Sequence, residues 1–377
     1  MQEEFAKAVK KRNYKLASVG KGKNSSIVIS ESDIFSEVDT HSFEEVCHWL
    51  EENNIHIDAA GSLAGGGAIP TLQKLNNRYN LPTKIPSDLI VGMSKFDQAK
   101  IYEKYNLTTI RSWCVDDFPA FQDKYDRFVV KPAIGRGSVG VEFLDKDELT
   151  QRIKGGLIHK DYIIQSFQTG IEYRMMVFVQ DGQIKILAPI MRESYAGTTY
   201  LGRLSCDTHH ISRITDYCEK MIKNMNLVNT VIKFDILVSD KSIDMIEMDI
   251  SVGGGIYFQQ YIGELFECDI INRYLDLIVD IKFDKQKLKH DDFVMDYIYN
   301  ETGAPLNLQK DLLEAYLIHK CGDQTKVIYN KLKSWKTAKN SSNADFTVAV
   351  IHKNKSLKNS ELSHMVNNDL FNKWMLD

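Results

Sequence analysis

Two apolar runs flank a glycine-rich segment in residues 128–141. An apolar, β-branched run over 128–130 ends on Lys131, and a second apolar run begins at Val139. Between the two runs lies Gly-Arg-Gly-Ser, which is typical of a turn. The pattern predicts two strands joined by a glycine-rich loop. Such a loop can wrap a polyphosphate, because glycines let the backbone approach closely. A plain β-hairpin is the alternative interpretation.

Strand and helix periodicities divide the rest of the chain into three parts. Residues 1–92 alternate short strands and helices, residues 93–285 hold several strand pairs, and residues 286–377 are mostly helical. We therefore expect an N-terminal α/β lobe, a central domain of two subdomains with a hinge near 165–170, and a small C-terminal α+β extension with one strand at 346–352. The predicted fold class is α/β and α+β.

Five segments outside the central domain carry local predictions. Ser26–Ile29 and Ile55–Ile57 are apolar and β-branched and predict strands, whereas 324–335 has helical spacing. Ser42, followed three residues later by a glutamate, is a capping box and predicts the start of a helix. The glycine-rich turn at 61–70 precedes a helix, so it suits either an anion site or a tight connection.

Composition narrows the class of partner. The chain has 377 residues, with 47 Lys and Arg against 51 Asp and Glu. This balance lacks the excess of basic residues that is typical of nucleic-acid-binding proteins. No apolar run approaches the roughly 18 residues that a membrane span needs. The six cysteines lack Cys-x-x-Cys spacing, which argues against a zinc site or a disulfide framework and suits a reducing cytoplasm. We expect a cytoplasmic protein with small-molecule partners and no nucleic-acid or membrane partner; a homodimer is left open.

Acidic residues alternate with apolar ones in two consecutive predicted strands. Lys233 and Asp235 would share one face of the first strand, and Glu247 and Asp249 one face of the second. If the strands pair around a turn at 239–241, three carboxylates and a lysine converge. Such carboxylates repel one another unless a hard cation such as Mg²⁺ lies between them. An exposed sheet face with alternating charges is the alternative.

A third segment joins two predicted sheets. It contains Gln165, Ser166, Phe167 and Gln168, and it ends in Gly-Ile-Glu172. A hinge of this kind can pair an adenine through its backbone while Glu172 accepts ribose hydroxyls. A connecting turn with one glutamate is the simpler interpretation.

The order of these motifs resembles that of the ATP-grasp superfamily. Within it, the motifs are most similar to those of D-alanine–D-alanine ligase and biotin carboxylase. The resemblance covers roughly residues 20–285. It implies a nucleotide bound between two α+β subdomains, with ATP and Mg²⁺ as cofactors. The matching positions are Lys95, Lys131 with the loop from Gly135 to Gly140, the hinge from Gln165 to Glu172, Asp235, and Glu247-x-Asp249.

Roles for single residues follow from the resemblance. The implied nucleotide contacts are Lys95, Lys131, Arg136, Gly137, Ser138, Gln165, Ser166, Phe167, Gln168 and Glu172. Asp235, Glu247 and Asp249 would hold Mg²⁺, and Lys233 would be a catalytic residue beside the phosphates. Arg192 and Arg203 are the catalytic candidates for clamping a substrate carboxylate, because guanidinium pairs with carboxylate bidentately.

Three positions depart from the family pattern. Gln165 stands where a glutamate often receives the adenine amine, and an amide oxygen can still accept that hydrogen bond. Asp249 replaces the usual asparagine and makes the site more acidic. Ser251 stands where many relatives place an arginine that steadies an acyl phosphate, so Arg192 or Arg203 would supply that charge.

The resemblance implies an ATP-dependent carboxylate–amine ligase. ATP would phosphorylate the carboxylate, and the amine would displace phosphate from the resulting acyl phosphate. We expect the substrate between the turn at 65–67, the segment 189–193 and the loop at 253–255. Two alternatives remain: a phosphotransferase on the same nucleotide site, and an ATP-binding regulatory protein without turnover. The sequence does not identify the acid or the amine, or the role of residues 286–377.

Overall fold

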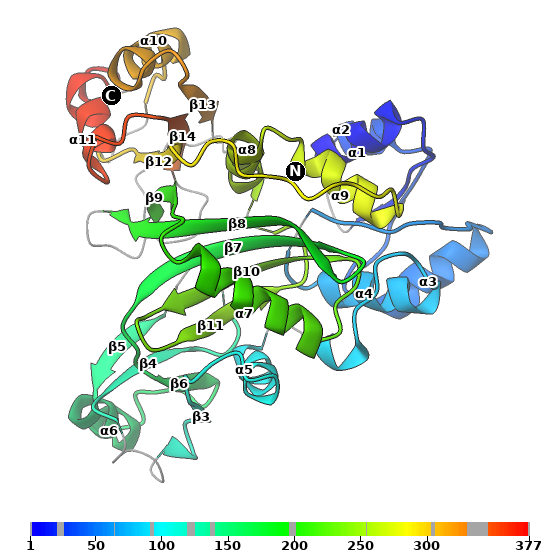
Figure 1. Cartoon of the computed structure of the whole chain (residues 1–377), viewed down its shortest axis with the longest axis horizontal. Helices are drawn as coiled ribbons and strands as arrows, with labels where there is room; N and C mark the ends of the chain where they lie inside the picture. The colour runs from blue at the N-terminus through cyan, green and yellow to red at the C-terminus, as the bar shows by residue number, and fades with distance from the viewer. Residues whose placement is uncertain are drawn as a thin grey trace.

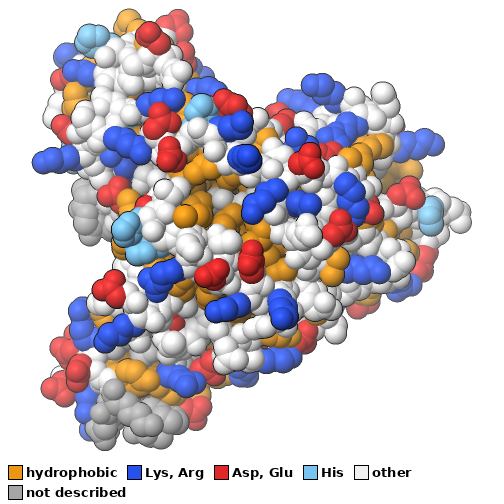
Figure 2. Space-filling view, viewed as in Figure 1, with side chains coloured by type: hydrophobic (Ala, Val, Ile, Leu, Met, Phe, Trp, Pro, Cys, Tyr) orange, Lys and Arg blue, Asp and Glu red, His pale blue; other side chains and the backbone are white. Residues whose placement is uncertain are grey.

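The computed structural model describes residues 2–20, 26–63, 65–90, 94–118, 125–135, 140–195, 201–253, 255–302, 306–329 and 346–375. In Figure 1 the small lobe lies below one large sheet, the N-terminal elements lie to its right, and the C-terminal elements lie at the upper left, where they extend the sheet. Figure 2 shows an indentation in the molecular outline between the C-terminal lobe and the small lobe below it. Hydrophobic side chains are exposed near the centre of this face. No helix in the described ranges is long and apolar enough to cross a membrane.

The N-terminal lobe is built on a short parallel strand pair. Its elements are α1 (Gln2–Lys11), β1 (Ala17–Gly20), α2 (Ser26–Glu31), β2 (Ile34–Glu37), α3 (Phe43–Glu52), α4 (Ile69–Arg78) and the 3₁₀ helix η1 (Ser87–Leu89). The predicted helix start at Ser42 is confirmed, since its side chain accepts a hydrogen bond from the Glu45 amide, while the Ser42 amide itself donates to Asp39 O. The predicted strand at 26–29 is wrong: β1 and β2 pair in parallel, and the chain between parallel strands must cross over, here through α2. The structure assigns no strand at Ile55–Ile57 either.

The small lobe holds the predicted strand–loop–strand unit. Its antiparallel sheet has the order β3 (Ser112–Cys114), β6 (Tyr162–Ser166), β4 (Arg127–Pro132), β5 (Glu142–Asp145), with α6 (Lys146–Lys154) on one face. Helix α5 (Lys95–Lys104) lies between this sheet and the large one (Figure 1). Phe128 and Val130 point into the core under α6, so the alternate residues of β4 point to the other face.

The large sheet has eight strands. Their order is β11 (Ile243–Asp249), β10 (Thr230–Val238), β7 (Ile171–Gln180), β8 (Gln183–Ser194), β9 (Leu201–Cys206), β12 (Val294–Tyr299), β14 (Phe346–His352), β13 (Lys326–Tyr329). All neighbours are antiparallel. The predicted hairpin around Asp181–Gly182 is confirmed, and so is the pairing of the two acidic strands.

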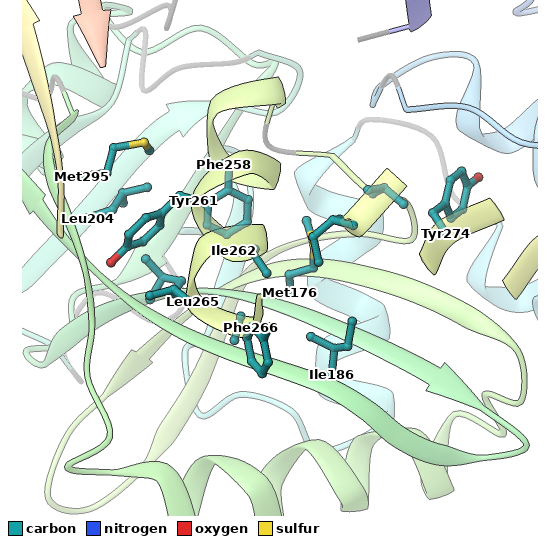
Figure 3. Packing of buried hydrophobic residues seen from close by; sticks show 14 of the residues in the cluster. Met176, Ile186, Leu204, Phe258, Tyr261, Ile262, Leu265, Phe266, Tyr274 and Met295 are labelled. Atoms are coloured by element: carbon teal, nitrogen blue, oxygen red, sulfur yellow. The ribbon is translucent and has the colours of Figure 1, made fainter. Parts of the chain in front are cut away.

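Helices cover both faces of this sheet. On one face α7 (Ile211–Asn224) buries residues spaced like one side of a helix, among them Ile214, Cys218 and Met221. On the other face lie α8 (Gly255–Phe266) and α9 (Ile270–Ile278). Figure 3 shows α8 side chains, such as Phe258 and Ile262, directed at the strands. Each such buried side chain contributes roughly 1.5–3 kcal/mol, so α8 holds this face firmly.

The C-terminal residues continue the sheet rather than forming a separate appendage. Strands β12, β14 and β13 add to the β9 edge, and α10 (Lys310–Cys321), α11 (Glu361–Asp369) and the 3₁₀ helix η5 (Phe371–Lys373) pack beside them. The predicted helix at 324–335 is wrong where the structure describes it, because Lys326–Tyr329 pairs with β14. The strand at 294–299 was not predicted from the sequence.

Candidate active site

Lys131 is the most perturbed cation of the small lobe. It lies near the end of β4 on the face turned away from the α6 core, and its side chain is buried. Burial, together with repulsion from Lys95, lowers the pKa of Lys131 to about 8, and the charges of Glu247 and Glu172 oppose this shift. Glu247 and Glu172 belong to the large sheet, so Lys131 lies where the two lobes face each other.

Lys95 is fixed beside it. Ser94 caps α5 by accepting a hydrogen bond from a helix amide, so Lys95 is the first residue of the helix. Its backbone N donates to Ala133 O at 2.8 Å, and its Nζ donates to Gly135 O at 2.9 Å. Burial lowers the pKa of Lys95, against the attraction of Glu247. The two predicted lysines therefore meet at the start of the glycine-rich loop.

The predicted acidic residues share one face of the large sheet. In the register of β10 and β11, Lys233 lies opposite Asp249 and Asp235 opposite Glu247. Residues directly opposite in an antiparallel pair point to the same side. The convergence predicted from the two alternating strands is thus confirmed at the level of strand pairing.

Asp235 has a different partner from the one expected. Arg174, opposite it on β7, donates from Nε and Nη2 to the two carboxylate oxygens at 3.0 Å each. Burial alone would raise the pKa of Asp235, but Arg174 and Lys233 hold it well below its usual range. Both oxygens of Asp235 therefore accept a hydrogen bond from Arg174, and its role as a Mg²⁺ ligand stays a prediction.

Arg174 itself was missed from the sequence. Its guanidinium carbon lies 6.0 Å from the centre of the Phe258 ring, and its Nη1 makes no hydrogen bond within the described residues. The available signal was its position: it stands two residues after Glu172 on one strand, so alternation places both on the same face. Its Nη1 is a donor left for an anion in the site.

Glu247 and Asp249 remain as carboxylates for a cation. Asp249 Oδ2 lies 3.4 Å from Lys233 Nζ. In the part of the chain that the structure describes, no group of three His, Cys, Asp or Glu residues could hold a metal. Mg²⁺ with a nucleotide commonly takes one or two carboxylates and completes its shell with phosphate oxygens and water. The donor set therefore fits a metal shared with phosphates rather than a cage made by the protein alone.

Glu172 and Arg192 form a pair across β7 and β8. Arg192 Nη1 donates to Glu172 Oε1 at 2.5 Å. The Nε of Arg192 is buried and has no hydrogen-bond partner among the described residues. The charge of Arg192 also acts on Asp235 and on Tyr297 of β12. Arg192 thus lies on the functional face, as its role as a carboxylate clamp requires.

Arg203 lies on the other face. It pairs with Glu193, which is adjacent to Arg192 along β8 and so points the opposite way. Its Nε and Nη2 donate to Asp296 at 2.5 and 2.7 Å, and His352 contacts the same carboxylate at 3.0 Å. This buried network corrects the expectation that Arg203 binds substrate, because its donors are used inside the C-terminal lobe.

The hinge residues begin at the end of β6, which contains Gln165 and Ser166. Gln165 shares a face with Lys131 and donates to Ser112 Oγ at 2.8 Å, whereas the Ser166 hydroxyl is buried and accepts from the Arg111 amide. The Ser166 amide donates in turn to Arg111 O at 2.9 Å, so both the amide and the hydroxyl of Ser166 bond within the small lobe. The Phe167 ring lies 4.4 Å from the Arg127 guanidinium. Gln168 is partly exposed at the start of the crossing.

Two glycines lie beside this site. A Cβ on Gly170 would come 2.6 Å from Val238 O, so only glycine fits where the hinge passes β10. A Cβ on Gly65 would lie 3.6 Å from Asp249 Oδ2, which puts the glycine-rich turn of the N-terminal lobe beside the acidic face. Ser251 accepts a hydrogen bond from Gly253 N at 3.2 Å. Arg136, Gly137 and Ser138 lie outside the described residues, and their roles stay predictions.

Comparisons with known proteins agree with this architecture. A family model for the ATP-grasp domain matches residues 105–250. The chain is similar to phosphoribosylglycinamide synthetase from Anaerococcus prevotii (TM-score 0.70, 17% identity, covering 100% of this chain and 96% of that one). It is similar also to an L-amino acid ligase from Bacillus licheniformis (0.71, 12%, 98% and 94%) and to N5-carboxyaminoimidazole synthetase from Staphylococcus aureus complexed with ADP (0.68, 11%, 98% and 94%). No curated protein matches the chain. At these identities the likeness establishes the fold.

Proposed function

Because the chain contains an ATP-grasp domain, as the order of its motifs predicted, we propose that it is an ATP-dependent ligase that joins a carboxylate to an amine. One observation carries the proposal: Lys131 of the small sheet lies within the electrostatic reach of Glu247 and Glu172 on the large sheet. Cations of one lobe and carboxylates of the other thus meet where a nucleotide would lie between them. The names of the similar structures, which include an L-amino acid ligase, support the same class of reaction.

In this proposal the phosphates of ATP lie against Lys95 and Lys131, and the ribose reaches Glu172. Glu247 and Asp249 would hold Mg²⁺, which when bound neutralises charge on the transferring phosphoryl group. The two lysines then stabilise the same charge from the opposite side.

The acceptor carboxylate would bind at Arg174 and Arg192, beside Lys233. Both arginines offer unused donors on the functional face, Nη1 of Arg174 and Nε of Arg192. Arg174, held rigid by Asp235, would supply the positive charge that Ser251 lacks. Phosphorylation gives the carboxylate a leaving group, and an amine then displaces it. The work of these residues is positioning and charge stabilisation, so no histidine-centred acid–base apparatus is required.

A phosphate-release assay with ATP, Mg²⁺ and pools of amino acids and small acids tests the reaction class. We expect release that requires both an acid and an amine. A phosphorylated alcohol as product would replace the proposal by a phosphotransferase, and nucleotide binding without any turnover would replace it by a regulatory role.

Glu247→Gln tests the metal side of the proposal. The change should lower ATP hydrolysis by more than about 100-fold, since the charge stabilisation by a bound metal is worth several kcal/mol. Glu193→Gln is the matched control, because Glu193 lies on the opposite face of the sheet. Hydrolysis at the wild-type rate in Glu247→Gln would remove Glu247 from the site.

We also propose a cytoplasmic location, supported by the state of the cysteines. All six are free, and none forms a disulfide. A homodimer stays a prediction.

A further inference from the structure

Glu172 and Arg192, which have separate expected roles, form an ion pair with each other. Glu172 and Arg192 each adjoin the paired residues Tyr173 and Met191 on β7 and β8, and Nη1 of the arginine is 2.5 Å from Oε1 of the glutamate. Under the proposed function Glu172 receives the ribose, and Arg192 receives the acceptor carboxylate. The ion pair therefore joins the nucleotide site to the acceptor site.

Their surroundings place the pair between the two sites. Glu172 acts on Lys131, so its charge faces the phosphate-binding lobe. Arg192 acts on Asp235 and Tyr297, so its charge faces the sheet side. The side chains are 36% and 18% exposed, which leaves Glu172 open to a ligand and Arg192 largely enclosed. The unpartnered Nε of Arg192 is a buried donor that this arrangement leaves unsatisfied.

We propose that Arg192 and the ribose hydroxyls compete for Glu172, so that a bound nucleotide frees Arg192 for the acceptor carboxylate. The inference rests on the proposed function for the identity of the two ligands. The ion pair opposes each ligand that must draw on one of its members. Whichever ligand binds first weakens the pair, and the second then binds without that opposition. The coupling is positive and, for binding, the same in both directions.

Calorimetric titration with Mg·ADP and Mg·2′,3′-dideoxy-ADP tests the competition without any acceptor. The quantity of interest is the ratio of the dideoxy Kd to the ADP Kd. The two nucleotides carry the same phosphates, so the ratio isolates the hydroxyls from general charge effects. In the wild type the ratio should exceed one. In Arg192→Gln it should rise on the order of fivefold, because nothing then competes for Glu172.

Further variants test whether the change in this ratio depends on Glu172 and on the charge of Arg192. Glu172→Gln should bring the ratio close to one, and the double variant should behave in the same way. Arg192→Lys, which keeps the charge but has one nitrogen, should lie between wild type and Arg192→Gln. Glu193→Gln, one residue along β8 on the other face, should leave the ratio unchanged. Thermal melting of each variant verifies that it is folded.

The outcomes distinguish a failure of the coupling from a failure of the proposed function. If Arg192→Gln binds both nucleotides with the wild-type ratio, the coupling is wrong while the proposed function stands. A wild-type ratio of one also overturns the coupling, since the hydroxyls then do not engage Glu172. If the wild type binds neither nucleotide, the proposed function fails, and the inference fails with it.

Discussion

Replacing Lys131 by methionine should stabilise the protein while abolishing tight nucleotide binding. The side chain is buried, and its pKa falls from the ordinary 10.5 to about 8 on folding. Each pKa unit corresponds to about 1.4 kcal/mol, so the buried charge destabilises the fold by about 3 kcal/mol at pH 7. Methionine has a similar length and no charge. Its variant should therefore unfold with a free energy about 3 kcal/mol higher.

The expected pH dependence has a definite sign. Between pH 8 and 10.5 the unfolded chain holds the lysine proton and the folded chain has released it, so wild-type stability rises with pH in this window. The advantage of Lys131→Met is fully present below pH 8, falls to about half by pH 9.5, and disappears above 10.5.

Differential scanning calorimetry measures this effect. For a chain of 377 residues, about 3 kcal/mol corresponds to a rise of roughly 4 °C in Tm at pH 7. Lys160→Met, on the exposed surface of the same lobe, is the control and should shift Tm by less than about 1 °C. A Lys131→Met protein that melts below wild type at pH 7, or a difference in Tm that stays constant from pH 7 to 9.5, would refute the reasoning.

Two further predictions follow from the same site and its surroundings. Because Lys131 has a pKa of about 8 and phosphates favour its charged form, binding of Mg·ADP to the wild type near pH 8 should take up a proton; calorimetry in two buffers of different ionisation enthalpy measures this uptake, and a binding heat that is the same in both buffers would contradict it. Arg203→Met should destabilise the fold by about 3–5 kcal/mol, because it leaves Asp296 buried without its main cation, yet the Kd of Mg·ADP should stay within about twofold of wild type. An Arg203→Met protein of normal Tm with weakened ADP binding would return Arg203 to the active site.

The central domain could be predicted because its signals are local and repeated. The alternation in β10 and β11 sets which residues share a face, and the observed register matches it. The order of motifs from Lys95 to Asp249 then predicted the fold that the comparisons support.

The sequence does not predict a residue's environment where a contact from a distant part of the chain determines it. The partner of Asp235 could not be predicted from its own strand, because the neighbouring strand β7 brings Arg174 to both of its oxygens. Arg203 reads as a free cation, and its partner Asp296 is 93 positions away in the chain. The segment at 26–29 has β-branched residues, but the parallel pairing of its flanking strands requires a crossover there. In each case the deciding contact is non-local.

The continuation of the large sheet through β12 determines how far the chain can be shortened. Every residue of β9 is buried, and one of its two sides pairs with β12. A protein ending at residue 285 would present this otherwise buried strand as an open edge, which favours association with other chains. The C-terminus can therefore not be shortened as far as residue 285, although the resemblance to the nucleotide-binding motifs ends there. Limited proteolysis should not release a stable fragment that ends at this residue.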